Sequence, residues 1–301
     1  MAKLIRLVCG LSLLVLIISR PLLADAQTCI WVFKETAKLQ EAEAKIDQAM
    51  LARWVDAHQG KAKELAKFVQ KKLHLVGKDE FFHALDNAVS ELRKKNIPSE
   101  DIVFVYLNQG GQEMYKSGPW VTGYLLSKYP ELNGAKTIEL GKVMGLPKSA
   151  RPKHFVIVDD ASYSGDQVKQ LAATIASRKI KFSDVASISC LVPFASSAAK
   201  DGTERALKRY GMTADWLGAT PLPTMRELLH EEGMDTPENL GMATDMWGDF
   251  ALDKPLTLFF YKTPDFMSFP QQIRRGETPN GTKIPFIEDG RPPYYDVGLP
   301  R

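Results

Sequence analysis

The stretch 154–167 constrains the fold of this chain most, because an apolar run, two acids, a small-residue turn and a helical pattern follow one another there. Phe155 to Val158 is a continuous β-branched and aromatic run, which is typical of a parallel strand buried on both faces. From Gln167 onward, apolar residues recur at helical spacing. We therefore predict that Ala161 to Gly165 form the turn between this strand and a helix over 166–178.

Two acids, Asp159 and Asp160, lie at the tip of the predicted strand. The start of the following helix leaves free backbone N–H groups beside the positive end of the helix dipole, which favours a phosphate. Ser162 and Ser164 add hydroxyl donors, and Gly165 permits a close backbone approach. Ionised carboxylates accept hydrogen bonds from sugar hydroxyls and bind hydrated Mg²⁺. The segment therefore predicts a site for a phosphorylated sugar.

The residues Val-Ile-Val-Asp-Asp-Ala-Ser-Tyr-Ser-Gly at 156–165 resemble the PRPP-binding signature of type I phosphoribosyltransferases. In that signature an apolar strand precedes two acids, three variable residues, Thr or Ser, and Gly. The resemblance implies that Asp159 and Asp160 are the catalytic acids that hold the ribose hydroxyls. It also implies a loop for the 5′-phosphate, formed by Ala161, Ser162, Tyr163, Ser164 and Gly165. Mg²⁺ is expected to arrive with the ligand, with no direct metal ligand from the protein.

The match departs from the usual signature at three positions. Ser164 replaces the commoner Thr, and Asp166 and Gln167 follow the glycine where a small residue and Thr are usual. Asp166 would cap the helix, although its charge would repel a nearby phosphate. An ordinary strand-to-helix turn with a capping residue is the competing interpretation. We favour the phosphate site because order, spacing and flanking periodicity agree with it.

Two further segments are predicted to face this site. The strand Ile102 to Leu107 precedes a Gly-rich stretch and a helix from Pro119 to Lys128. In a phosphoribosyltransferase-like fold the intervening loop faces the pyrophosphate, and its candidate residues are Gly110, Gly111, Lys116 and Ser117. A Gly-rich surface loop is the alternative. Lys262 and Asp265, after the last strong strand at 256–261, are candidates for the hood over the second substrate, and a strand-ending Pro-Asp turn is the alternative.

Alternating strands and helices over 99–270 predict an α/β fold with a Rossmann-like parallel sheet of phosphoribosyltransferase type. Before it, 27–98 is predicted to be a helical region whose apolar residues form a layer on the sheet. After it, the Pro- and Gly-rich segment 271–301 is predicted to be an irregular hood or tail. Residues 1–26 are set apart from these domains by their composition.

The N-terminal segment 1–26 has the pattern of a secretory signal, with two basic residues before a short apolar run and a cleavage site near Ala26. We expect export to a periplasm or secretion, and an uncleaved membrane anchor is the alternative. Cleavage would remove three basic residues and one acid and so lower the formal net charge from +3 to +1. Net charge therefore gives no support to a nucleic-acid partner.

Cysteines and histidines suggest no metal or redox centre. The mature chain would keep Cys29 and Cys190, which an oxidising compartment would allow to pair. Cys190 lies in an apolar run, however, so we favour a buried, inert thiol over a disulfide. His58, His74 and His83 lack the spacing of metal ligands, so we expect surface or structural histidines.

The predicted function is that of an exported phosphoribosyltransferase-like protein. It would bind a phosphorylated ribose, PRPP or a related nucleotide, with Mg²⁺, and transfer the phosphoribosyl group to a nitrogen nucleophile, which is a glycosyltransferase reaction. The alternatives that keep the same fold are a non-catalytic binding protein for a sugar phosphate or nucleotide and a secreted effector.

Overall fold

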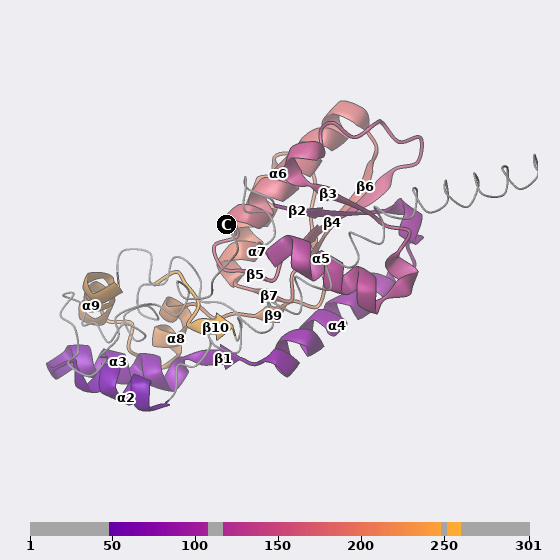
Figure 1. Ribbon diagram of the computed structural model, residues 1–301. Helices are drawn as coiled ribbons and strands as arrows, with labels where there is room; N and C mark the ends of the chain where they lie inside the picture. The colour runs from indigo at the N-terminus through magenta and orange to yellow at the C-terminus, as the bar shows by residue number, and fades with distance from the viewer. Residues whose placement is uncertain (1–47, 108–116, 248–251, 260–301) are drawn as a thin grey trace, which may run out of the picture.

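The computed structural model describes residues 48–107, 117–247 and 252–259. Its largest sheet has five strands in the order β3-β2-β4-β6-β8. The strands β2, β3, β4 and β6 are labelled in Figure 1. The strands are β2 (Ile102–Tyr106), β3 (Lys136–Glu139), β4 (Lys153–Val158), β6 (Val185–Leu191) and β8 (Asp215–Trp216). Every neighbouring pair is parallel, which confirms the predicted α/β class with a Rossmann-like sheet.

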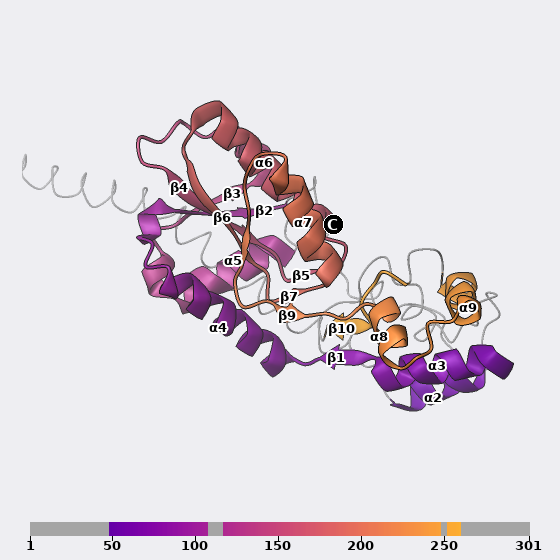
Figure 2. The ribbon, with the colours of Figure 1, turned by 180° about the vertical axis from the view of Figure 1, so that it is seen from behind.

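Helices cover both faces of this sheet (Figures 1 and 2). They are α4 (Lys78–Lys94), α5 (Ser117–Lys128), α6 (Asp166–Phe182) and α7 (Ser197–Lys208). Along β4, Val156 and Val158 belong to the core formed with α4 and α5. Phe155 and Ile157 belong to the core formed with α6 and α7. Successive side chains of a strand point to opposite faces, so a continuous apolar run is what a central strand of this sheet requires.

After short breaks, the chain continues from β4, β6 and β8 into the three strands of a second parallel sheet. This sheet has the order β5-β7-β9, with strands Ala161–Ser162, Phe194–Ala195 and Thr220–Pro221. Ala161 pairs with Phe194, and Ser162 with Ala195. The turn before α6 is therefore shorter than the predicted turn over 161–165, because its first two residues are in β5.

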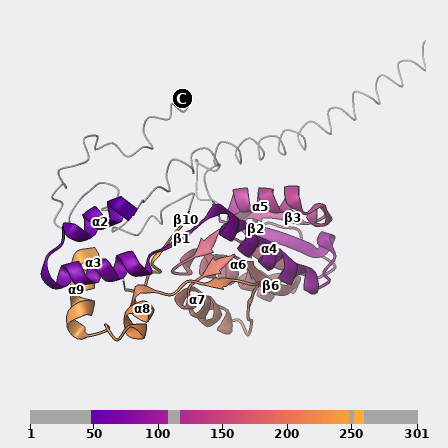
Figure 3. The same ribbon diagram turned by 90° about the horizontal axis from the view of Figure 1, so that it is seen from below.

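The N-terminal helices are present but are divided between two cores. Helix α4 packs on the central sheet as predicted. Helices α2 (Gln48–Asp56) and α3 (Gly60–Lys72) instead pack with α8 (Met225–Glu231) and α9 (Pro237–Trp247). Figure 3 shows α2, α3, α8 and α9 grouped beside the sheet. We call these four helices the helical lobe. A helical pattern shows that an apolar face is buried, but it does not show which partner buries it.

The strands β1 (His74–Val76) and β10 (Thr257–Phe259) pair in parallel between the sheet and the helical lobe (Figure 2). Leu258 lies in the core of the lobe, whereas Phe259 lies in the core of the central sheet. Because neighbouring residues of a strand point to opposite sides, β10 belongs to both cores.

Several expectations fall outside the described residues. These are the segment 1–26, Cys29, the residues Gly110, Gly111 and Lys116, the hood candidates Lys262 and Asp265, and the tail from 271. The domain boundaries at 26, 98 and 270 stay predictions. Within the described ranges, no helix is long and apolar enough to span a bilayer.

Candidate phosphoribosyl site

The acid pair lies at the break between β4 and β5. Asp159 and Asp160 are almost fully buried, with 6% and 1% of their surfaces exposed. The backbone N–H of Asp159 donates to the carbonyl of Leu191 on β6, at an N···O distance of 3.4 Å. The two carboxylates are therefore held at the carboxyl end of the central sheet, where parallel α/β sheets bind their ligands.

Local hydrogen bonds fix the orientation of both carboxylates. Oδ1 of Asp159 accepts from the backbone N–H of Asp160 at 2.9 Å and from the hydroxyl of Ser117 at 2.5 Å. Oδ1 of Asp160 accepts from the backbone N–H of Ala161 at 2.8 Å. Donors of this kind stabilise the ionised form of a carboxylate, which is the form that accepts hydrogen bonds from sugar hydroxyls.

Gly165 ends the turn and precedes the first residue of α6. Its φ is +77°, and a Cβ atom at this position would lie 2.7 Å from Cα and 2.8 Å from the carbonyl oxygen of Ala199 on α7. Both the dihedral angle and the lack of space require glycine. The glycine of the signature thus permits a close contact with a second helix.

The start of α7 supports the turn from behind. The backbone N–H of Ser196 donates to the carbonyl of Ser162 at 3.0 Å, and the hydroxyl of Ser196 donates to the carbonyl of Tyr163. The same hydroxyl accepts from the N–H of Ala199 at 3.0 Å and caps α7. Ser196 is fully buried, so this hydrogen-bond pattern is part of the core.

The side chain of Tyr163 packs toward β10. Its hydroxyl lies 3.5 Å from the carbonyl oxygen of Thr257, and its ring lies edge-on to Phe259 at 6.1 Å between centroids. Burial and, to a smaller extent, the charge of Asp160 raise the pKa of this phenol well above its ordinary value. Tyr163 is therefore a neutral side chain that anchors the turn to β10.

The charge of Asp166 is offset by cations. Its carboxylate is exposed and forms an ion pair with Lys169 at 2.6 Å. The hydrogen bond from Lys169 is the main cause that lowers the pKa of Asp166, and the charge of Lys254 acts in the same direction. The repulsion that Asp166 would exert on a phosphate is correspondingly weaker than the sequence suggests.

Lys254 belongs to the segment that follows α9, far from the signature in sequence. Its carbonyl accepts from the N–H of Met225 at 2.9 Å, next to the capping box of α8. Glu227 of that box accepts from the hydroxyl of Ser197 at the start of α7. The helical lobe therefore reaches the site through α7 and Lys254.

The other residues named from the sequence that lie in the described ranges are Ser117, Cys190, His58, His74 and His83. Ser117 was predicted to lie in the loop before α5, but it is the first residue of that helix. Cys190 is a fully buried free thiol whose pKa is raised by burial. His58 is buried against Trp54, whereas His74 and His83 are exposed. No group of three or more His, Cys, Asp or Glu residues could hold a metal in the part of the chain that the structure describes.

A parallel α/β sheet with an acid pair and a glycine turn at its carboxyl edge defines a phosphoribosyltransferase-like protein. The model of the family PRTase-CE matches residues 51–220, which is more than half of the chain. The chain therefore belongs to the PRTase-CE family. No curated protein and no solved structure matches it.

Three features of the site have no signal in the signature itself. They are the hydrogen bond from Ser117 to Asp159, the support of the turn by α7 and the approach of Lys254. Each joins segments that are at least 30 residues apart in the sequence, and sequence reasoning alone gives no distance between such segments. Gly165 was predicted to permit a close backbone approach, but its positive φ and its contact with α7 were not predicted.

Proposed function

We propose that the acid pair and the turn bind a phosphorylated ribose, PRPP or a related nucleotide, together with Mg²⁺. The observation that carries this proposal is the pair of buried, oriented carboxylates at the end of β4, before the turn that leads into α6. Carboxylates accept from the ribose hydroxyls, and backbone N–H groups at the start of the helix bind the phosphate. Carboxylate oxygens also suit Mg²⁺ that is shared with the phosphates of the ligand.

The reaction that we propose, as the resemblance to phosphoribosyltransferases implies, is transfer of the phosphoribosyl group to a nitrogen nucleophile. The bond between C1 of the ribose and the pyrophosphate oxygen breaks, pyrophosphate leaves with the electron pair, and a C1–N bond forms. The nitrogen loses its proton to solvent. Such transfers depend mainly on orientation of the sugar and stabilisation of the phosphate charges, so no nucleophilic side chain is needed.

Calorimetry of the chain from Gln27 onward with PRPP and Mg²⁺ tests the proposal, with ribose 5-phosphate as the second ligand. We expect both to bind, and the Asp159→Asn/Asp160→Asn double variant to bind at least tenfold more weakly. Asp201→Asn is the matched control, because Asp201 is an exposed acid on α7. Unchanged binding in the double variant, or no binding by the wild type, would refute the site.

Release of pyrophosphate from PRPP in the presence of nucleobases tests the transfer step separately. Release that depends on both a base and the acid pair supports the transferase. Binding of PRPP without release would instead support a non-catalytic binding protein or an effector with the same fold.

We also propose that the protein is exported after cleavage near Ala26, on the basis of the basic and apolar pattern of residues 1–26. Sequencing the N-terminus of the protein from its own host should give Gln27 as the first residue. A start at Met1 in the membrane fraction would show that the segment is an anchor.

A further inference from the structure

We infer that Ser117 is a positioning residue that orients the Asp159 carboxylate for the ribose, and that it is not a ligand of the pyrophosphate. The inference rests on the proposed function and adds a role to the site that the signature does not contain. It starts from the hydrogen bond that the Ser117 hydroxyl donates to Oδ1 of Asp159 at 2.5 Å. An ionised carboxylate has no proton, so the hydroxyl is the donor in this pair.

A serine hydroxyl has one proton to donate. When Ser117 donates it to Asp159, the hydroxyl has only acceptor capacity left, and an anion such as pyrophosphate requires donors. Ser117 could donate a hydrogen bond to a leaving pyrophosphate only by giving up its hydrogen bond to Asp159. Binding of the anion by Ser117 would therefore weaken the orientation of the acid that holds the sugar.

The position of Ser117 is set by the close contact of the next residue with the sheet. A Cβ atom on Gly118 would lie 2.5 Å from Cβ of Tyr106 on β2 and 3.2 Å from the carbonyl oxygen of Val158 on β4. Gly118 thus brings the first turn of α5 against the end of β4, where Val158 directly precedes Asp159. Ser117 directly precedes Gly118, and Asp159 directly follows Val158. The packing of α5 on β4 therefore sets the geometry of the hydrogen bond between Ser117 and Asp159.

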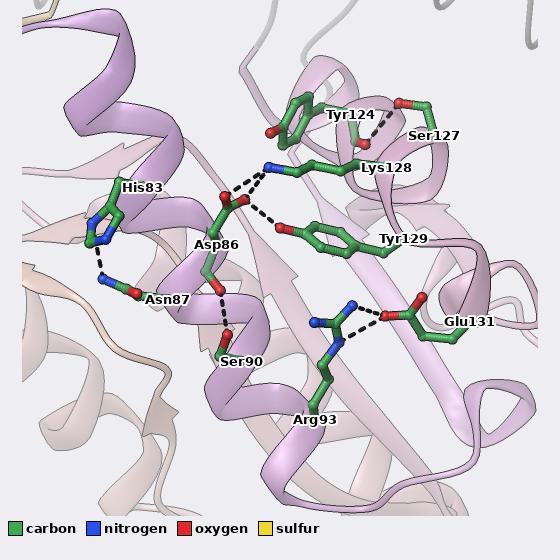
Figure 4. A network of polar contacts seen from close by, with 10 residues as sticks. All are labelled: His83, Asp86, Asn87, Ser90, Arg93, Tyr124, Ser127, Lys128, Tyr129 and Glu131. Carbon is green, nitrogen blue, oxygen red and sulfur yellow. Dashed lines mark hydrogen bonds and ion pairs between the residues drawn. The ribbon is translucent and has the colours of Figure 1, made fainter.

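The far end of α5 is fixed as well. Asp86 of α4 accepts from Lys128 at 2.7 and 2.8 Å and from the hydroxyl of Tyr129, as Figure 4 shows. The adjacent pair of Arg93 and Glu131 adds a second link. With both ends of α5 fixed, Ser117 is presented to Asp159 by a rigid element and not by a loop side chain.

Two hydrogen bonds to the same oxygen fix the rotation of the Asp159 side chain. Oδ1 accepts from the hydroxyl of Ser117 and from the N–H of Asp160. Loss of the first leaves a buried carboxylate with one orienting donor fewer, and hydrogen bonds to charged groups are the stronger class. Removal of the hydroxyl should therefore weaken binding of the sugar and leave binding of the phosphate unchanged.

Calorimetry with two probes separates these parts. Inorganic phosphate reports the turn alone, and ribose 5-phosphate reports the turn together with the acid pair. We expect Ser117→Ala to weaken ribose 5-phosphate binding about tenfold with little change for phosphate. Ser117→Thr keeps the hydroxyl and should restore wild-type binding. Ser127→Ala is the matched control, because Ser127 is an exposed hydroxyl at the other end of α5.

The outcomes are distinguishable from a failure of the proposed function. If the wild type does not bind ribose 5-phosphate, the proposed function and this inference both fail. If the wild type binds and Ser117→Ala binds equally well, only the inference fails. Equal weakening of phosphate and ribose 5-phosphate would overturn it too, since it would show a contact with the anion. If Ser117→Ala does not fold, Ser117→Cys replaces it, because cysteine has a similar shape and is a weaker donor. The inference then requires that Ser117→Cys weakens binding of ribose 5-phosphate more than binding of phosphate.

Discussion

At Gly165 the chain has a left-handed backbone conformation and touches the backbone of another helix at the same time. Either property favours glycine, and together they make the position intolerant of any side chain. The position is therefore a test of whether the turn and α7 form one packed unit. Gly202, on α7, has no atom within 4 Å of a Cβ position and shows no positive φ, so it serves as the matched control.

Gly165→Ala should destabilise the protein by more than about 2 kcal/mol, since the left-handed conformation alone costs roughly 1–2 kcal/mol and the clash with Ala199 adds to it. Gly202→Ala should be neutral or stabilise by up to about 1 kcal/mol, because alanine is the better helix former. Urea denaturation of both variants measures the difference. Equal stability of the two would contradict the close packing of the turn on α7.

His58 makes the helical lobe sensitive to acid. Its Nδ1–H donates to the carbonyl of Trp54 at 2.8 Å, and its Nε2 is buried with no hydrogen-bond partner among the described residues. Burial, opposed in part by that hydrogen bond, lowers the pKa of His58 from its ordinary value of 6.5. The unfolded chain therefore binds a proton more readily, and stability should fall as the pH drops below 6.5.

His58→Phe should remove this part of the pH dependence, because the side chain no longer titrates. Gln59→Ala, at the exposed position next to His58, replaces no titrating side chain and is the control. The measurement is the free energy of unfolding at several pH values between 4 and 8. A wild-type curve that does not fall in acid more steeply than that of His58→Phe would show that His58 is not buried as described.

At the scale of elements, the contact between α4 and α5 is polar and aromatic. Tyr129 donates to Asp86, and the guanidinium of Arg93 lies 4.8 Å from the centroid of the Tyr129 ring (Figure 4). Burial, with the hydrogen bond and charge of Asp86, raises the pKa of Tyr129 from 10.0 to about 12. The folded state holds the phenolic proton more strongly, so this contribution to stability is complete below pH 10 and is lost as the pH rises to about 12.

Tyr129→Phe should lose stability at pH 8 by about 1 kcal/mol, through the missing hydrogen bond, and should lose less than the wild type between pH 9 and 12. Tyr210→Phe is the control, because the Tyr210 hydroxyl makes only a long contact of 3.4 Å with Ser177 among its hydrogen bonds in the described chain. Thermal denaturation followed against pH gives both effects. Parallel curves for wild type and Tyr129→Phe above pH 10 would contradict the raised pKa.

The elements that could be predicted from the sequence are those whose own residues carry enough signal. The run Phe155 to Val158 and the helical spacing after Gln167 predicted β4 and α6, because burial on both faces and amphipathic spacing are local patterns. The strands β5, β7 and β9 have two residues each, too few to show a period. Their hydrogen bonds depend on the neighbouring strands, which a sequence pattern does not contain.

The same limit applies to the candidate site. Asp159, Asp160 and the glycine turn were predicted together because they are adjacent in the sequence. Ser117 was assigned to a loop, whereas it lies in the first turn of α5, two residues before the predicted helix start at Pro119. Proline at an early helical position is compatible with a start before it, so the boundary was read too late.

At the scale of the whole molecule, β10 joins two hydrophobic cores through neighbouring residues. Phe259 contacts Phe194 at 5.2 Å and Phe81 at 6.1 Å between ring centroids, beneath the turn that Tyr163 anchors. Leu258 lies with the helical lobe. Through these two residues, β10 links the core of the helical lobe to the core beneath the turn.

Phe259→Ala and Leu258→Ala should both destabilise the protein, by about 3–5 and about 2–5 kcal/mol, because each empties a buried position. They should differ in ligand binding. Phe259→Ala removes the ring on which Tyr163 packs and should weaken ribose 5-phosphate binding at temperatures where the variant stays folded. Leu258→Ala should bind as the wild type does. Circular dichroism establishes folding and calorimetry gives both affinities; equal loss of affinity in the two variants would show that stability, and not the packing of Tyr163, controls the turn.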